Sequence, residues 1–185
     1  IHPYNKAGEA LAAMQPQAII LSGGPNSTTD ADSPRVDHAV FDYGAPILGI
    51  CYGEQLICAE LGGKVESGHH AEFGRAEIVI TKDSPLFAGI RALDHREPVW
   101  MSHGDRVTQL PDGFQAVGKA AGSPISIIAD ETRKFYAMQF HPEVAHTPDG
   151  AKLIRNFVRN IVGCAGDWTI RAFREEAIEK IRAQV

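Results

Sequence analysis

One cysteine lies between two glycines in the stretch GICYGEQL, residues 49–56, where a short apolar run ends. Gly49, Cys51 and Gly53 have the spacing of a nucleophile elbow, a sharp turn from a strand into a helix. The N-terminus of that helix directs free N–H groups and partial positive charge at the sulfur, which favours the thiolate. A free cysteine is also a common small core residue, so both interpretations of Cys51 stay open on this pattern alone. For Cys58, inside the predicted helix, the core interpretation is the better one.

A nucleophilic thiol needs a base, and the stretch QFHPEV, residues 139–144, contains a candidate. Alternate residues of an extended segment point to the same side, so His141 and Glu143 are expected to lie side by side. Pro142 supports this because the residue before a proline prefers extended backbone. Glu143 would then accept a hydrogen bond from one ring nitrogen of His141 and leave the other nitrogen facing Cys51. Taken alone, the same residues also fit a surface turn.

Backbone N–H groups that could bind a tetrahedral oxyanion are expected at two places. One is Tyr52, directly after the cysteine, and the other is Gly24 in the SGGP turn at residues 22–25. Without a partner site, Gly23 and Gly24 would indicate only an ordinary turn.

The elements that must position these residues begin as alternating strands and helices. Apolar runs at 17–21 and 45–50 predict buried strands. Ser33 as N-cap, Pro34 and the stop at Gly44 predict a helix over 33–44, and helical spacing predicts another over 54–63. This pattern is typical of a parallel α/β layout with strands buried on both faces.

From about residue 74 the pattern changes to strands with few helices between them. Strands are predicted at 74–81, 96–102, 113–120, 124–130 and 134–140, with a hairpin turn joining the last two. Amphipathic helices are then predicted over 148–163 and 166–185, the second with an apolar stripe formed by Ile170, Phe173, Ala177, Ile178 and Ile181.

The composition indicates one globular domain: 185 residues, of which 44% are hydrophobic and 22% charged. A formal net charge of -5 gives no general attraction to nucleic acid or to an anionic membrane, so we expect neither partner. No apolar run approaches the roughly 20 residues of a membrane span. Three cysteines without paired spacing fit the reducing cytoplasm. The group His69, His70 and Glu72 has metal-ligand residue types, but its spacing favours a solvated loop over a metal site.

Three motifs in this order, LSGGPNS (21–27), GICYGEQ (49–55) and QFHPEV (139–144), resemble the class I (triad-type) glutamine amidotransferases. The resemblance covers essentially the whole chain and favours the nucleophile interpretation of Cys51 over the core interpretation. It implies a flavodoxin-like three-layer α/β fold with a mixed, mainly parallel central sheet.

The resemblance also implies a role for each site residue. Cys51 would attack the side-chain amide of glutamine, His141 would carry protons, and Glu143 would orient His141. The remaining roles are backbone oxyanion donors at Gly24 and Tyr52, and contacts to bound glutamine from Gln55, Ser102 and His103. The resemblance implies no metal or organic cofactor in this domain.

Finer features, VWMSHGD (99–105), HPEVAHTPDG (141–150) and GDWTI (166–170), resemble the glutaminase domains of GMP synthases. Residues 1–163 would form the amidotransferase domain, and 164–185 a linker helix toward an ATP-pyrophosphatase (synthetase) domain. That partner would use ATP and Mg²⁺ to aminate XMP to GMP, in a full-length homodimer. The alternatives are the glutaminase of another synthetase, a γ-glutamyl hydrolase, and a non-catalytic glutamine-binding remnant.

Two departures from the family pattern carry expectations of their own. Glu54 stands inside the elbow where the family usually has Met, and we expect its side chain to point away from Cys51. A strand, a turn and a helix that usually open such domains are not found before Ile1, so we expect Ile1 near the start of the second strand of the family fold.

Overall fold

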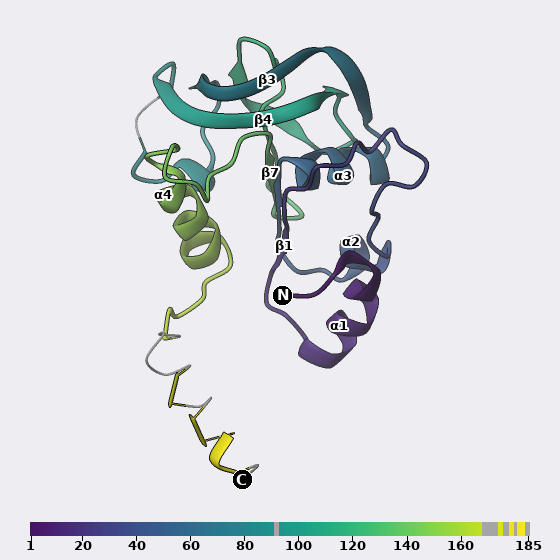
Figure 1. Ribbon diagram of the computed structural model, residues 1–185. Helices are drawn as coiled ribbons and strands as arrows, with labels where there is room; N and C mark the ends of the chain where they lie inside the picture. Colours follow the sequence, from purple (N-terminus) through teal and green to yellow (C-terminus); the bar gives the residue numbers. More distant parts are fainter. Residues whose placement is uncertain (91–92, 168–173, 176–177, 180, 184–185) are drawn as a thin grey trace.

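A seven-stranded sheet in the order β1-β2-β7-β6-β5-β3-β4 organises the computed structural model (Figure 1). The structure describes residues 1–90, 93–167, 174–175, 178–179 and 181–183. Three neighbouring strands are parallel: β1 (Ile19–Leu21), β2 (Ile47–Ile50) and β7 (Phe135–Met138). The other four strands pair antiparallel: β3 (Lys64–Ile80), β4 (Arg96–Gln109), β5 (Gln115–Ala120) and β6 (Ile127–Asp130).

The predicted α/β fold with a mixed sheet is confirmed, with one correction. Most of the sheet is antiparallel: short connections reverse the chain between β5 and β6 and between β6 and β7, and β3 also pairs antiparallel with β4 and β5. The expectation of a mainly parallel sheet is wrong outside β1, β2 and β7. The long pair β3 and β4 crosses the top of the molecule in Figure 1.

Helices cover both faces of the sheet and give the three layers. One face carries α1 (Ala7–Met14), α2 (Ala39–Asp42) and α3 (Tyr52–Glu60). The other carries η2 (Pro85–Phe87), α4 (Gly150–Arg155) and its π-helical continuation η3 (Asn156–Ile161). A short helix, η1 (Tyr4–Lys6), precedes α1.

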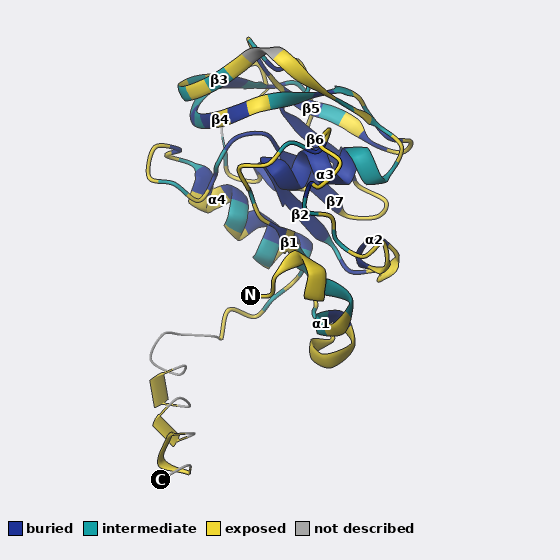
Figure 2. Cartoon of the chain, turned by 45° about the vertical axis from the view of Figure 1, so that its right-hand side comes forward, coloured by how far each residue is buried: buried dark blue, intermediate teal, exposed yellow. Residues whose placement is uncertain are grey.

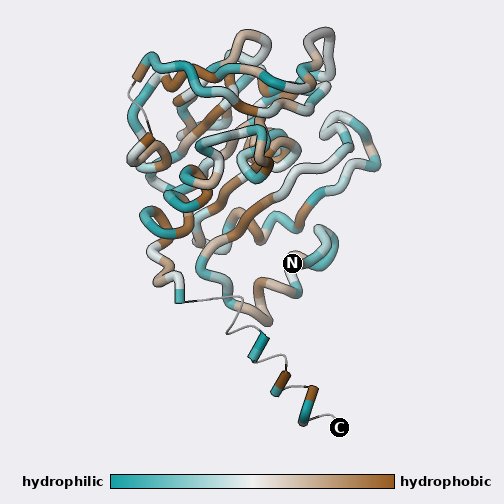
Figure 3. Tube along the Cα trace, turned by 60° about the vertical axis from the view of Figure 1, so that its left-hand side comes forward, coloured by the Kyte–Doolittle hydropathy of each residue, from teal (hydrophilic) through white to brown (hydrophobic). Residues whose placement is uncertain are grey.

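The side chains of the central strands alternate between these two layers. Ile47 of β2 packs toward α3, whereas its neighbours Leu48 and Ile50 pack toward α4 and η3. The four residues of β2 and the four of β7 are all buried (Figure 2). Apolar residues accordingly concentrate along these central strands (Figure 3). Strands buried on both faces are rigid, and their ends are therefore good supports for a site.

Several predicted elements differ from the structure. The helix predicted over 33–44 is only α2, since the Asp37 carboxylate accepts a hydrogen bond from the Ala39 N–H at 3.0 Å and so begins the helix there. Arg35, before it, donates to the Thr28 carbonyl and pairs with Glu60 of α3. The closing helix begins at Gly150 rather than 148 and changes to π-helical form at Asn156.

Three further expectations concern segments outside the central sheet. Residues 69–72 lie inside strand β3 and do not form the expected loop, although the pairing of β3 with β4 is irregular between Ser67 and Glu72. Ile1 lies in irregular backbone before η1 and not at the start of a strand. Most of the helix predicted over 166–185, including Ile170, Phe173 and Ala177, lies outside the described residues; Ile178 and Ile181, which are described, are exposed. No helix in the described part of the chain is long and apolar enough to cross a membrane.

Candidate active site

Cys51 lies at a sharp corner between β2 and α3. Its backbone has φ 53° and ψ −106°, a strained conformation for a residue with a side chain. A Cβ on Gly49 would lie 2.7 Å from Ile57 Cδ1, and one on Gly53 only 2.1 Å from the Leu21 carbonyl oxygen. Both glycines are therefore required by close packing, as the elbow pattern predicts.

The Cys51 thiol is buried, with 4% of the residue exposed. Burial is the main reason that the pKa of this thiol is raised to about 11; the negative charges of Glu54 and Glu143 also raise it, while hydrogen bonds from the Tyr52 N–H and from Gln139 lower it. The helix N-terminus thus contributes as expected, but the expectation that it makes the thiolate the favoured form is wrong because desolvation is the larger effect. The resting thiol donates to the Ser102 carbonyl at 3.5 Å.

His141 follows β7, and Glu143 holds its ring. The His141 Nδ1 and Glu143 Oε1 atoms are 2.7 Å apart, so the structure brings the two side chains together as predicted. Gly23 lies between the ring and the cysteine: a Cβ there would be 3.1 Å from His141 Cε1 and 3.5 Å from Cys51 Cβ. Since β1, β2 and β7 are adjacent and parallel, the residues that follow them meet at one edge of the sheet.

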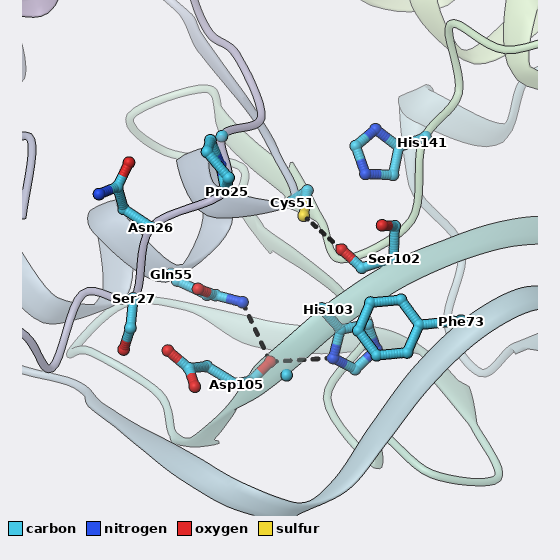
Figure 4. Close-up of a pocket in the computed structure, with 12 residues that line it drawn as sticks. Pro25, Asn26, Ser27, Cys51, Gln55, Phe73, Ser102, His103, Asp105 and His141 are labelled. Carbon is cyan, nitrogen blue, oxygen red and sulfur yellow. Dashed lines mark hydrogen bonds between the residues drawn. The ribbon is translucent and has the colours of Figure 1, made fainter.

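A pocket with a volume of about 490 Å³ opens over Cys51 (Figure 4). Its wall includes six of the predicted site residues: Gly24, Cys51, Gln55, Ser102, His103 and His141. Tyr52 lies beside Gly24, with its Cβ 3.9 Å from where a Gly24 Cβ would stand, and Glu143 lies behind His141. The structure therefore brings the predicted residues into one site.

Ser102 and His103 lie within strand β4, which continues beyond the strand predicted over 96–102. The β3–β4 pairing continues through both residues and fixes their backbone. The His103 ring is buried, with Nδ1 donating to the Asp105 carbonyl at 2.9 Å and Nε2 lying 3.3 Å from Glu72 Oε2. Gln55 Nε2 donates to the same Asp105 carbonyl at 3.0 Å, which links α3 to β4 across the pocket floor.

Three residues of the site were missed by the sequence analysis. Asp105 lines the pocket, and its buried Oδ2 has no hydrogen-bond partner among the described residues. Thr147 Oγ1 donates to the His141 carbonyl at 2.7 Å and accepts from the Trp100 N–H at 3.1 Å. Gln139 is fully buried next to the thiol. All three stand in the quoted motifs, but the motifs do not show which side chains turn inward.

Glu54 is fully buried, and neither carboxylate oxygen has a hydrogen-bond partner in the described part of the chain. Burial raises the pKa of this carboxyl well above its ordinary range. The charge of Glu54 is therefore suppressed, because an unpaired carboxylate in the interior is too costly. Glu54 is not among the residues that line the pocket over Cys51, and its negative charge, where it forms, raises the pKa of the Cys51 and Cys58 thiols.

The described residues contain no group of three or more His, Cys, Asp or Glu side chains arranged to hold a metal ion. The side chains of His69 and His70 are outside this description. The groups that line the site are a thiol, an imidazole with a carboxylate behind it, and backbone donors.

A cysteine elbow with a neighbouring His-Glu pair, at the carboxyl edge of an α/β sheet, defines a cysteine-dependent amide-hydrolysing type of site. The family model for "Glutamine amidotransferase class-I" matches residues 1–161. The chain belongs to the class I glutamine amidotransferases.

Relatives with curated names agree with this assignment. Over 185 residues the chain is 68% identical to a GMP synthase (glutamine-hydrolyzing) of Rhodopseudomonas palustris strain BisB18 and 60% identical to one of Brucella melitensis. These matches cover 100% of the chain but 35% and 36% of the relatives, so the chain spans about a third of their length.

Solved structures are similar over most of the chain. A putative GMP synthase subunit of Thermoplasma acidophilum is 30% identical, with a TM-score of 0.72 over 97% of this chain and 83% of that one. A glutamine amidotransferase of Thermotoga maritima, 19% identical, has a TM-score of 0.65 over 80% of this chain and 79% of that one, and supports the fold alone.

Proposed function

We propose that this chain is the glutaminase part of a GMP synthase and hydrolyses the side-chain amide of glutamine to glutamate and ammonia. The observation that carries the proposal is the strained Cys51 elbow facing the His141–Glu143 pair across a pocket that is large enough for an amino acid.

Cys51 is the nucleophile, and its raised pKa makes His141 a general base that must remove the proton when substrate is present. The sulfur adds to the amide carbon, and the oxyanion is bound by the backbone N–H groups of Tyr52 and Gly24. His141 then protonates the departing ammonia, which leaves a γ-glutamyl thioester on Cys51. Water, deprotonated by His141, hydrolyses that thioester, while Glu143 keeps the imidazole oriented.

The other end of glutamine carries an ammonium and a carboxylate group, and the pocket offers complementary groups. The Asp105 carboxylate, which belongs to a pocket-lining residue, would accept a hydrogen bond from the ammonium group. Gln55 uses its amide N–H₂ on the Asp105 carbonyl and Gln139, which leaves its oxygen for substrate. Ser102 and His103 contribute the rigid β4 wall.

The ammonia would pass to a synthetase domain that uses ATP and Mg²⁺ to aminate XMP, in a homodimeric cytoplasmic enzyme. The name and length of the relatives, of which this chain matches only about a third, support the synthetase partner. Curated relatives at 60–68% identity are GMP synthases, which disfavours a γ-glutamyl hydrolase, another synthetase or a non-catalytic remnant.

The test measures ammonia and glutamate released from glutamine by the chain, with and without a GMP synthase synthetase domain, ATP, Mg²⁺ and XMP. Glutaminase activity that disappears in Cys51→Ala and persists in Cys58→Ala is the expected result. GMP formation from glutamine in the combined system supports the finer assignment. No ammonia release under either condition from folded protein contradicts the proposal.

A further inference from the structure

The Cys51 sulfur has a second side-chain neighbour that the mechanism above does not use. Gln139 follows β7, is 0% exposed, and places Nε2 3.7 Å from Cys51 Sγ. Its backbone N–H donates to the Ser126 carbonyl at 2.9 Å, which fixes where the residue leaves the strand. An amide that is buried without partners costs free energy, so the position of each of its polar atoms matters.

The contacts determine which end of the Gln139 amide faces the sulfur. The Asp105 carbonyl can only accept, so Gln55 must present its N–H₂ group to it, at 3.0 Å. The same N–H₂ group is 3.1 Å from the Gln139 side chain, which must therefore present its oxygen to Gln55. The N–H₂ end of Gln139 is then left to point at Cys51. The chain of contacts from β4 through α3 thus fixes an N–H donor at the sulfur.

We propose that Gln139 is a further catalytic residue, whose side-chain N–H stabilises the Cys51 thiolate when it forms and again when it leaves the thioester. A neutral donor suits this place because a second positive charge beside His141 would hinder His141 from accepting the proton. The bond strengthens when the sulfur is anionic and weakens when the sulfur is acylated, so it lowers the barriers for formation and for hydrolysis of the thioester.

The direction in which Gln139 shifts the pKa of the Cys51 thiol agrees with this role. The hydrogen bond from Gln139 lowers the pKa of Cys51, against the larger opposing effect of burial. The titratable groups that surround the sulfur are Glu54 from α3, His141 and Glu143 after β7, and His103 and Asp105 from β4. Gln139 is uncharged, so its hydrogen bond to the sulfur does not depend on a titration of its own.

The inference rests on the proposed function, but its test needs no glutamine and stands or fails separately. Iodoacetamide reacts with thiolate, so the alkylation rate of Cys51 reports the thiolate population. The rate is measured by peptide mass spectrometry between about pH 6 and pH 9, with Cys164 in the same sample as the internal reference. In Gln139→Met, which has no donor, Cys51 should react about tenfold more slowly at each pH, the factor for a shift of one unit in the thiol pKa.

Gln139→Glu separates an electrostatic role from a structural one, because it keeps the size of the side chain. A protonated carboxyl can donate as the amide does, whereas an ionised carboxylate repels the thiolate. The alkylation rate of Cys51 in Gln139→Glu, divided by that in wild type, should therefore fall as the pH rises. The same ratio for Gln139→Met should stay constant. Met138→Leu, a volume-conserving change in the preceding buried residue, is the control for disturbance of β7 and should react as wild type does.

The proposal is overturned if Cys51 in Gln139→Met is alkylated at the wild-type rate. It is also overturned if the alkylation rate of Gln139→Glu relative to wild type does not change with pH. If Gln139→Met does not fold, judged by circular dichroism, the nearly isosteric Gln139→Glu decides the question alone.

Discussion

The Glu143 carboxylate accepts a hydrogen bond from His141 Nδ1 at 2.7 Å, although the Glu143 side chain is 45% exposed to solvent. The bond fixes Nδ1 as the protonated nitrogen and leaves Nε2 as the base. A partly solvated carboxylate can be replaced by an amide that still accepts this bond. We therefore expect Glu143→Gln to lower kcat by about tenfold, the effect of weakening one charge-assisted bond.

His141→Ala should lower kcat by about a thousandfold, because no neighbouring group replaces the proton carrier. Steady-state glutaminase kinetics measure both variants, and Glu9→Gln, an exposed carboxyl on α1, is the matched control. Equal losses in two folded variants would contradict the assigned roles. A rise in KM with unchanged kcat for Glu143→Gln would instead indicate direct binding of substrate.

The three cysteines should respond differently to two kinds of electrophile. Cys51 and Cys58 are buried and Cys164 is half-buried, and burial raises the pKa values of both buried thiols. A small neutral alkylating agent should therefore modify Cys164 first. A glutamine-shaped electrophile such as 6-diazo-5-oxo-L-norleucine should modify Cys51 and spare the other two, because it occupies the pocket beside His141.

Peptide mass spectrometry after limited reaction measures which cysteine each of the two electrophiles modifies first. The control is the same reaction with excess glutamine, which should protect Cys51 alone. Modification of all three cysteines at similar rates by the glutamine analogue would show that the pocket does not direct it to Cys51.

The sequence predicts the elbow well because its constraints are local. Gly49 and Gly53 are required by contacts with Ile57 and with the Leu21 backbone, and the spacing of these glycines is visible in the sequence itself. His141 and Glu143 are likewise close neighbours in the chain, so their pairing follows from the extended backbone.

What the sequence does not predict depends on contacts between distant segments. The Asp105 carboxylate lines the pocket only because β4 pairs with β3, and the Gln139 amide is oriented by a bond from another element, at Gln55. The expectation of a favoured thiolate is wrong for the same reason. The helix N-terminus is a local feature, but the desolvation that outweighs it comes from the whole packed sheet.

Thr147 should act as a positioning residue for His141. Its hydroxyl joins the His141 carbonyl to the Trp100 N–H, and the residue is 5% exposed. Thr147→Val keeps the shape but leaves both groups unpaired, which costs about 1–3 kcal/mol for each buried polar group. We expect kcat to fall by about tenfold with KM little changed, since the His141 backbone loses its anchor rather than a substrate contact.

Thr147→Ser supplies the comparison, because it keeps the hydroxyl and loses only the methyl group. It should restore most of kcat, and the unfolding free energies of both variants measure how much of the effect is general stability. A Ser variant that is as slow as the Val variant would indicate that the methyl packing, and not the hydroxyl, matters.

Glu54 should make the fold less stable as the pH rises. Its folded-state pKa is raised well above that of an unfolded chain, where a glutamate titrates at about 4.3. Below that pH both states hold the proton. Above it the unfolded chain releases its proton while the folded chain keeps it, so the free energy of unfolding decreases with pH until the folded carboxyl also ionises. This contribution changes by up to about 1.4 kcal/mol per pH unit.

Glu54→Met removes both the titration and two unpaired buried oxygens, and Glu54→Gln removes only the titration. Urea unfolding between about pH 4 and pH 8 should show each variant gaining stability over wild type as the pH rises, by on the order of 2 kcal/mol at neutral pH. Glu77→Gln, an exposed carboxyl on β3, is the control and should show no such trend. If the difference in unfolding free energy between Glu54→Gln and wild type stayed constant across this range, the Glu54 carboxyl would titrate normally in the folded chain. Solvent or a partner group would then have to reach it behind α3.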